Sequence, residues 1–331
     1  MRMTINTGAV LRWLGAAAVL LLGACGRSEP PAAAPGGAAS SRQPIYAFVQ
    51  VGAESAWRTA ETASIRDEAE KRNVKLLFAD GQQRQASQIA ALRSFIGQKV
   101  DAIILAPVVA SGWEPVLREA KAANVPIILV DRGIDTTDET LFATLIASDF
   151  VEEGRMAARW LAERTKGQCR IVELEGTTGS APAIDRKRGF AEVLAQHPGM
   201  SILKSQPADF ERGKGKEVME AFIKAEGRNI QAVYAHNDDM ALGAIQALKE
   251  AGMKPGVDVL VVSIDAVKPA FDAMILGELN ATVECNPLLG PMAFDAIERL
   301  RRGETLPRFI KQEDRLFVAE QAAGMIEERR Y

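Results

Sequence analysis

The sequence has few of the residues that build metal centres and disulfide frameworks. Its 331 residues include two histidines, His197 and His236, and three cysteines, which is too small a stock for a Cys/His zinc site or a disulfide-stapled fold. It also lacks a strong positive charge, because 40 basic and 43 acidic side chains give a formal net charge of −3. A nucleic-acid backbone needs such a positive field. We therefore expect no metal, no other cofactor and no nucleic-acid partner.

The N-terminus lacks an apolar run long enough to cross a membrane. Its apolar stretch, residues 14–24, has eleven residues, whereas a membrane-spanning helix needs roughly 20. A start with two arginines, a short apolar middle and small residues at the end are typical of a secretory signal. We predict such a signal at residues 1–24, with export to the periplasm or cell envelope.

The predicted signal leads into the sequence Leu-Gly-Ala-Cys at 22–25. This sequence resembles the lipobox of bacterial lipoproteins, which predicts that Cys25 is an acylated lipid anchor to a membrane. An ordinary cleaved signal with a chance cysteine is the alternative. Residues 25–42 are rich in Pro, Ala, Gly and Ser, a composition typical of a disordered tether.

The rest of the chain alternates short apolar runs with amphipathic stretches. Predicted helices include 57–72, 86–98, 153–164 and 238–251, the last with Asn237 as N-cap and Gly252 as C-cap. Many of the apolar runs are continuous, as in strands buried on both faces of a parallel sheet. The ten predicted strands are 45–51, 74–79, 102–106, 126–130, 142–147, 170–174, 202–206, 232–235, 259–264 and 281–284. Repeated units of this kind predict an α/β protein with two doubly wound, parallel-sheet lobes.

Polar residues recur where the predicted strands end. In open α/β sheets, ligands bind outside the carboxyl ends of the strands. Carboxylates, an amide, an arginine and an aromatic residue occupy that edge: Asp80, Asp131, Arg132, Asp149, Asp209, Phe210, Asn237, Asp265 and Glu284. Each Asp or Asn taken alone is also explained by a turn or a helix N-cap. Together these residue types suit a neutral, polyhydroxylated ligand such as a sugar.

Motifs for catalysis are incomplete. Gly213-Lys214-Gly215-Lys216 lacks the spacing of a phosphate-binding loop, and no Gly-x-Ser-x-Gly is present to serve His236. A glycosidase needs two carboxylates on either side of the bond that it cleaves. Asp131 and Glu284 are left open as such a pair.

Long segments of the chain resemble one known family, the periplasmic sugar-binding proteins of ABC transporters, of the ribose- and galactose-binding type. The resemblance is strongest to the galactofuranose binders. The segments that carry it are GAESAWR (52–58), ADGQQ (79–83), LAPVVASGWEP (105–115), DR (131–132), EGTTGSAPAIDRKRGF (175–190), ADFERGKGKEVME (208–220), YAHNDDMALGAIQALKEAG (234–252) and ATVECNP (281–287). The resemblance implies a type I periplasmic binding protein, whose two lobes close on a sugar like a clamshell.

The resemblance also implies which residues bind the sugar. These are Trp57, Arg58, Asp131, Arg132, Arg186, Phe210, Asn237, Asp265 and Glu284. Asp80 and Asp149 are further candidates that could equally cap helices. Phe150 stands where the family often has an asparagine, which predicts an aromatic ring at the cleft edge.

The family's three-crossover hinge makes both lobes discontinuous in sequence. The first lobe is expected at 43–147 plus 285–315 and the second at 148–284 plus 316–331. Crossovers are expected near 147–149, 266–284 and 315–318. Export permits a disulfide, but two buried thiols are favoured for Cys169 and Cys285.

The implied function is reversible capture of a monosaccharide, galactofuranose or a related pentose or hexose. The protein is expected to be monomeric, to have no enzymatic activity and to deliver its sugar to a membrane ABC permease. Two alternatives stay open. One is a sensor that presents bound sugar to a receptor or kinase, and the other is a periplasmic sugar-processing enzyme.

Overall fold

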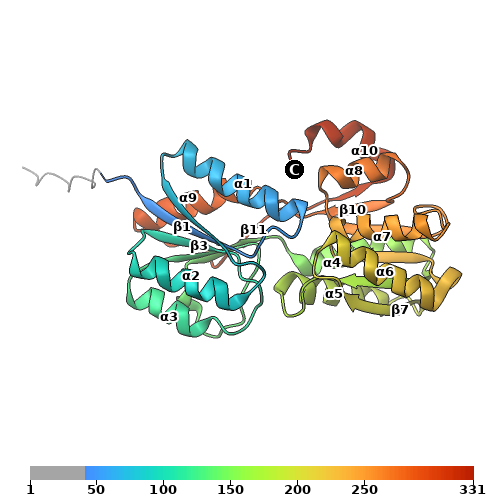
Figure 1. The fold of residues 1–331 in the computed structure, drawn as a ribbon, viewed down its shortest axis with the longest axis horizontal. Helices are drawn as coiled ribbons and strands as arrows, with labels where there is room; N and C mark the ends of the chain where they lie inside the picture. Colours follow the sequence, from blue (N-terminus) through green and yellow to red (C-terminus); the bar gives the residue numbers. More distant parts are fainter. Residues whose placement is uncertain (1–41) are drawn as a thin grey trace, which may run out of the picture. The chain divides into compact units, whose positions relative to one another are not determined.

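The computed structural model describes residues 42–331. The predicted signal segment, Cys25 and the predicted tether up to residue 41 lie outside the described residues. Residues 43–331 form one compact unit that contains two six-stranded sheets, each with its own helices (Figure 1). Within residues 42–331, no helix has the length and the apolar composition that crossing a bilayer requires.

The first lobe is built on an entirely parallel sheet. Its strands, in sheet order, are β11 (Phe309–Lys311), β5 (Thr144–Ala147), β4 (Ile127–Val130), β3 (Ala102–Leu105), β1 (Ile45–Gln50) and β2 (Lys75–Asp80). Strands β3 and β4 are buried at every position, which explains their continuous apolar runs. The sequence prediction missed only β11, whose three residues are too few to show a period.

The second lobe repeats the same strand order. Its strands are β12 (Leu316–Val318), β10 (Ala281–Glu284), β9 (Leu260–Asp265), β8 (Ala232–Ala235), β6 (Gln168–Glu175) and β7 (Gly199–Pro207). The pairs are parallel except that β12 runs antiparallel to β10. The edge strand β12 was also missed, for the same reason as β11.

Helices cover both sheets. In the first lobe they are α1 (Ala56–Lys71), α2 (Gln85–Gly97), α3 (Glu114–Ala122) and α9 (Gly290–Arg301). Helix α1 packs on α9, α2 packs on α3, and the two pairs lie on opposite sides of the sheet (Figure 1). In the second lobe they are α4 (Phe150–Arg164), α5 (Ala181–Leu194), α6 (Arg212–Glu226), α7 (Asp238–Glu250), α8 (Lys268–Ile275) and α10 (Ala319–Met325). Short 3₁₀ turns lie at Glu139–Leu141, Gly227–Asn229 and Ile326–Glu328.

Helix α7 shows how local sequence fixes a boundary at the strand edge. Asn237 has extended backbone, and its Oδ1 accepts a hydrogen bond of 3.0 Å from the backbone N–H of Met240. This confirms the predicted N-cap, because such an oxygen satisfies one of the free N–H groups of the first turn. The C-cap is Ala251, and Gly252 follows it with φ of +67°, the left-handed conformation that favours glycine after a helix.

The chain passes between the two sheets at 148–149, 285–289 and 312–315. The prediction that placed the second crossover at 266–284 is wrong, because α8 and β10 fill that range and both belong to the second lobe. The third crossover lies before the predicted 315–318, where β12 has already joined the second sheet. Hydrogen bonds bridge the lobes, from Gln83 Nε2 to Glu211 Oε1 (3.0 Å) and from the N–H of Ala110 to the carbonyl of Gly179 (2.8 Å).

Candidate functional site

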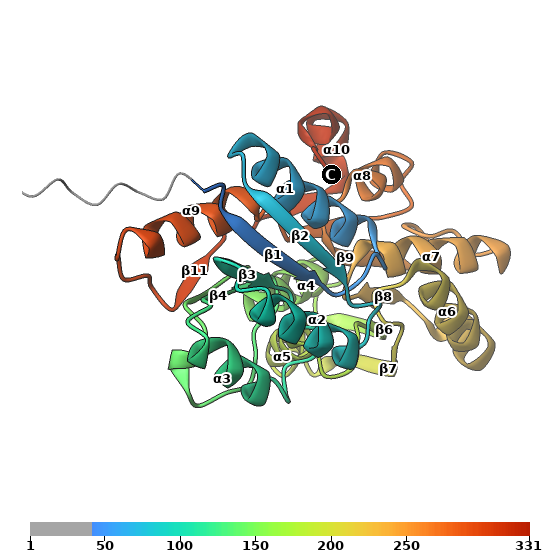
Figure 2. The same ribbon diagram turned by 60° about the vertical axis from the view of Figure 1, so that its left-hand side comes forward.

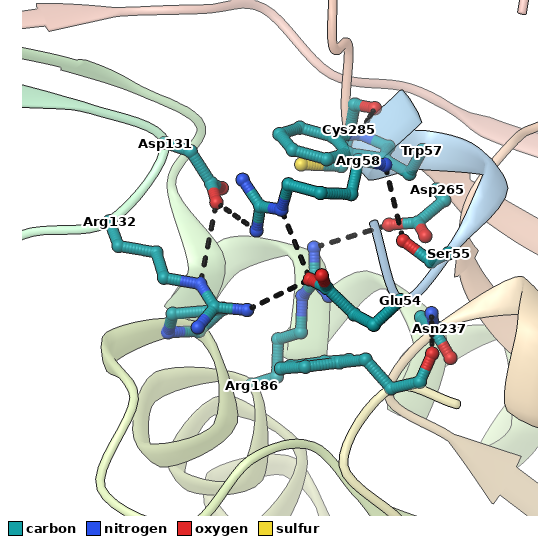
Figure 3. A pocket seen from close by; sticks show the side chains of 12 residues that line it. Glu54, Ser55, Trp57, Arg58, Asp131, Arg132, Arg186, Asn237, Asp265 and Cys285 are labelled. Atoms are coloured by element: carbon teal, nitrogen blue, oxygen red, sulfur yellow. Dashed lines mark hydrogen bonds and ion pairs between the residues drawn. The ribbon is translucent and has the colours of Figure 1, made fainter. Parts of the chain in front are cut away.

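A small cavity lies between the carboxyl edges of the two sheets. The first lobe contributes residues that follow β1 and β4, the second lobe contributes residues from α5 and from the ends of β7, β8 and β9, and the second crossover adds one more. The lining residues are Glu54, Ser55, Trp57, Arg58, Asp131, Arg132, Pro182, Arg186, Phe210, Asn237, Asp265 and Cys285 (Figure 3).

Arg58 is the centre of the first lobe's charge network. Its Nη2 donates to Asp131 Oδ2 at 2.7 Å, its Nη1 to Glu61 Oε2 at 2.6 Å and its Nε to Glu54 Oε1 at 3.1 Å. Burial alone would lower the pKa of Arg58, but the three carboxylates outweigh burial and raise that pKa well above its usual value. Burial raises the pKa of Glu61 to about 7, although Arg58 opposes this. Arg58 therefore stays charged although its side chain is buried.

Arg132 extends the network toward the other lobe. Its Nη1 donates to the carbonyl of Val108 at 3.0 Å, and its Nη2 lies 3.8 Å from Glu54 Oε1. Burial and the positive charge of Arg58 lower the pKa of Arg132 to about 10. The preceding Asp131 has φ of +60°, a strained conformation of the kind that clusters at functional sites. Figure 3 shows the Glu54 carboxylate between the guanidinium groups of Arg58 and Arg132.

Arg186 plays the corresponding role in the second lobe. Its Nε donates to Glu153 Oε2 at 2.7 Å, its Nη1 to the carbonyl of His236 at 2.6 Å, and its Nη2 lies 3.6 Å from Asp265 Oδ1. Burial raises the pKa of Asp265 well above its usual value, and Arg186 only partly opposes this. The guanidinium of Arg186 also stacks 5.3 Å from the ring of Phe150, so the predicted aromatic ring packs behind this arginine.

Close packing of α4 against α5 holds Arg186 in place. A Cβ on Gly189 would lie 1.9 Å from the carbonyl oxygen of Val151, and a Cβ on Gly154 would lie 2.2 Å from that of Arg186. Only glycines allow the two helices to approach this closely, and the approach brings Glu153 of α4 to Arg186 of α5.

Phe210 forms an aromatic wall between the lobes. Its ring lies 5.3 Å from the guanidinium carbon of Arg132 and 6.0 Å from that of Arg186, within the range of cation–π attraction. Phe210 has φ of +63°, and a Cβ on Gly176 would lie 1.9 Å from its ring. Asn237 Nδ2 donates to the carbonyl of Phe210 at 3.1 Å. The ring is therefore held from behind by a glycine and from the side by the N-cap of α7.

Trp57 connects the first lobe to the second crossover. Its indole Nε1 donates to the carbonyl of Cys285 at 2.6 Å, and its ring lies 4.8 Å from the guanidinium carbon of Arg58. Cys285 and Cys169 are both buried, free thiols, as favoured from the sequence. Burial raises the pKa of both thiols, which disfavours the reactive thiolate.

Most of the residues predicted to bind the ligand meet in this cavity, but three do not. Trp57, Arg58, Asp131, Arg132, Arg186, Phe210, Asn237 and Asp265 all line it. The side chain of Glu284 instead accepts hydrogen bonds from Arg329 Nη1 (2.8 Å) and the hydroxyl of Tyr331 (3.0 Å). Asp80 is exposed and accepts a hydrogen bond of 2.7 Å from the N–H of Gln82. Asp149 caps α4 by accepting from the N–H of Glu152 at 3.1 Å, and also contacts Lys311.

The structure adds residues that were not predicted as ligand-binding: Glu54, Ser55, Pro182 and Cys285. Glu54 is the most informative of them, because it is buried and its Oε2 has no hydrogen-bond partner within the described part of the chain. Its position four residues before Arg58 was the available signal, since that spacing allows an ion pair. Ser55 caps α1 by accepting from the N–H of Arg58, and its role could have been read from the helix boundary.

The cavity offers paired charges and two aromatic surfaces rather than a reactive group. Every arginine that lines it is already ion-paired, and one carboxylate oxygen of a lining residue, Glu54 Oε2, has no hydrogen-bond partner within the described residues. Carboxylates accept hydroxyl groups, guanidinium groups donate in a fork, and aromatic faces cover apolar C–H surface. The arrangement therefore suits a small, neutral molecule with many hydroxyl groups.

Comparison with known proteins assigns the family. The sequence profile described as "periplasmic binding protein domain" matches residues 46–305. The chain belongs to this family of periplasmic binding proteins. It is 55% identical over 263 residues to the galactofuranose-binding protein YtfQ of Escherichia coli strain K12, covering 78% of this chain and 83% of that protein.

Solved structures of family members support the same assignment. The binding protein of the arabinose ABC transporter from Shewanella sp. ANA-3, bound to L-arabinofuranose, is 52% identical, with a TM-score of 0.85 over 86% of this chain and 95% of that one. A protein from Mycobacterium smegmatis in complex with β-D-fucofuranose is 47% identical, with a TM-score of 0.85 over 87% and 95% of the two chains. The family and the type I fold predicted from the sequence are thus confirmed.

Proposed function

We propose that the protein captures a monosaccharide in its furanose form, of the galactofuranose or arabinofuranose type, and delivers it to an ABC permease. The observation that carries the proposal is the interlobe cavity, which is lined by Arg58 and Asp131 of the first lobe and by Arg186 and Asp265 of the second. The relatives above, at 47 to 55% identity, are named or described with furanose sugars. Capture of a sugar of this class agrees with both observations.

Binding is coupled to closure of the lobes. A sugar in the cavity contacts Arg58 and Asp131 from the first lobe and Arg186 and Asp265 from the second. It therefore stabilises the closed state selectively, because only that state brings both sets of groups to the sugar. The closed form is the state that a permease would recognise as loaded.

The geometry favours binding over hydrolysis. The pair that was left open for a glycosidase, Asp131 and Glu284, does not share the cavity, because Glu284 is turned toward Arg329 and Tyr331. Asp131 is held by Arg58 at 2.7 Å, which ties it into an ion pair. Incubation with candidate sugars, followed by NMR, tests this point, and the appearance of a product would show an enzyme.

The location, the lipid anchor and the lobe boundaries are proposed from the sequence pattern. We place the protein in the periplasm as a monomer, with Cys25 acylated and residues 26–42 as its tether. We also propose that the first lobe comprises residues 43–147 plus 285–315 and that the second comprises residues 148–284 plus 316–331. Mass spectrometry of the mature protein tests the anchor, because diacylglyceryl modification of Cys25 adds a defined mass to the N-terminal peptide.

The decisive experiment measures binding and ring form together. Isothermal titration with D-galactose, L-arabinose, D-ribose and D-fucose identifies the ligand, and carbon-13 NMR of the labelled, bound sugar identifies its ring. We expect tight binding of at least one of them, with bound carbon shifts in the furanose range. Bound shifts in the pyranose range would refute the furanose proposal, and failure of all four sugars to bind would refute the proposed substrate class.

A further inference from the structure

Two helices from different lobes begin beside each other across the cleft. Helix α1 of the first lobe starts at Ala56, and α7 of the second lobe starts at Asp238. Both views of the ribbon show these two ends as neighbours (Figures 1 and 2). The backbone N–H of Ala56 donates to Asp239 Oδ2 at 2.8 Å. Neither Ala56 nor Asp239 lines the cavity.

Each of these two helices also has a side-chain cap from its own lobe. Ser55 caps α1 by accepting from the N–H of Arg58, and Asn237 caps α7 by accepting from the N–H of Met240. The first N–H groups of a helix point out of it and give its N-terminus a partial positive charge. Lobe closure brings two such positive ends together, which would be unfavourable without an anion between them. The Asp239 carboxylate supplies that anion.

The carboxylate is held ready before the lobes meet. Arg212 Nε and Nη2 both donate to Asp239 Oδ1, at 3.0 and 2.8 Å, from within the second lobe. Asp239 is 5% exposed. When the lobes open, Oδ1 keeps its arginine and only the contact of Oδ2 with Ala56 is broken. The interaction between Asp239 and Ala56 therefore belongs to the closed state alone.

We propose that Asp239 is a positioning residue, a charged latch that stabilises the closed state whichever sugar is bound. The proposal rests on the function proposed above, because closure retains the sugar. On this proposal, Asp239 affects the rate at which the sugar dissociates. It does not affect the relative affinities for different sugars. A residue that contacts the sugar would instead change the relative affinities for different sugars.

Asp239→Asn tests the latch by removing its charge at nearly constant volume. We expect the variant to bind its sugar about tenfold more weakly, equivalent to about 1.4 kcal/mol. The loss should lie in the dissociation rate, measured by stopped-flow tryptophan fluorescence, since the latch forms only after the sugar has entered. Glu250→Gln is the matched control, because Glu250 lies on the same helix and pairs with Lys216 away from the first lobe. We expect this control to bind as the wild type does.

A second variant removes the donor from the opposite lobe. Ala56→Pro deletes the N–H that contacts Asp239, and proline is well accepted at the first position of a helix. Ser55, with φ of −142° and ψ of 163°, already has the extended backbone that a residue before proline prefers. The two substitutions form a double-mutant cycle. If loss of this contact causes the loss of affinity, the double variant should bind the sugar no more weakly than whichever single variant has the lower affinity.

The outcomes separate the latch from the proposed function. A loss of more than threefold in both single variants, with no further loss in the double variant and an unchanged ratio of affinities for two sugars, supports the latch. A smaller loss, additive losses or a changed ratio overturns it. If the wild type binds no tested sugar, the proposed function fails, and the latch is tested on the sugar-free protein by the distance between spin labels on the two lobes. Asp239→Asn must then populate the open state more than the wild type does, and an unchanged distance distribution overturns the latch.

Discussion

Replacing Arg186 by glutamine tests whether this arginine holds the second half of the site together. The side chain is 3% exposed, and its guanidinium donates to Glu153 and to the carbonyl of His236 while facing Asp265 at 3.6 Å. Glutamine retains hydrogen-bonding capacity but has no charge. The substitution therefore leaves two buried carboxyl groups, those of Glu153 and Asp265, without their cation.

The magnitude follows from those contacts. Removing one partner of a buried ion pair destabilises a protein by about 3–5 kcal/mol, so we expect the free energy of unfolding to fall by about that amount. A charge-assisted hydrogen bond to the sugar contributes about 1.5–3 kcal/mol, which corresponds to a loss of affinity of roughly ten- to 150-fold. We therefore expect Arg186→Gln to lose at least tenfold in affinity for its sugar.

The stability of Arg186→Gln should depend on pH. Burial already raises the pKa values of Glu153 and Asp265 in the folded protein, and loss of Arg186 raises them further. The folded variant then holds protons that its unfolded chain releases, so its stability falls as pH rises above about 5. The deficit against the wild type should be larger at pH 8 than at pH 5, because more of these carboxyl groups are protonated at the lower pH.

Urea unfolding at pH 5 and pH 8 and calorimetric titration at pH 8 measure these quantities. Arg188→Gln is the matched control, because Arg188 lies on the same helix with an exposed side chain and pairs with Asp185 on the surface. We expect this control to change neither stability nor affinity beyond experimental error. Unchanged affinity of Arg186→Gln would remove this residue from the site, and a deficit of equal size at both pH values would refute the ion-pair account.

Two further predictions concern the hinge and the aromatic wall. Asp314 lies in the third crossover and accepts a hydrogen bond from Ser148 of the first, and its partial burial raises its pKa to about 8. The contribution of Asp314 to wild-type stability should therefore be lost as pH rises from about 4 to 8. In urea unfolding, Asp314→Asn should gain about 4 kcal/mol on the wild type between pH 5 and pH 9, since each pKa unit corresponds to about 1.4 kcal/mol; an equal difference at both pH values would contradict this. Gly176→Ala should displace Phe210 and weaken sugar binding by tenfold or more, since the added Cβ would lie 1.9 Å from the ring; calorimetry showing wild-type affinity would refute this.

The sequence was sufficient for the fold because the strand signal is strong at the sheet centres. Strands such as β3 and β4 are apolar at every position and buried on both faces, so pattern alone located them. The edge strands β11 and β12 have three residues each and include exposed or half-buried positions. Their pairing depends on partners far away in the chain, at β5 and β10, which no local pattern records.

Prediction of the site succeeded at the level of strand ends and failed at the level of single side chains. The rule that ligands bind beyond the carboxyl ends of strands located β10 correctly. It could not decide which of two consecutive residues lines the cavity. Cys285 lines it, whereas Glu284 pairs with Arg329. That choice depends on the C-terminal segment, whose Arg329 and Tyr331 contact Glu284 across 45 and 47 residues of sequence.

The pairing of charges explains how so many buried ionic groups are compatible with a lobe movement. Arg58 and Arg132 find their carboxylates within the first lobe, and Arg186 finds Glu153 and Asp265 within the second. Opening the cleft therefore separates no ion pair of these three arginines, and the cost of exposing an unpaired charge does not arise. The contacts across the lobes are the Arg132–Phe210 stacking and hydrogen bonds such as those from Ala56 to Asp239, from Gln83 to Glu211 and from Ala110 to Gly179. Because these terms are small, the free energy of sugar binding can decide between open and closed, as reversible delivery of a ligand requires.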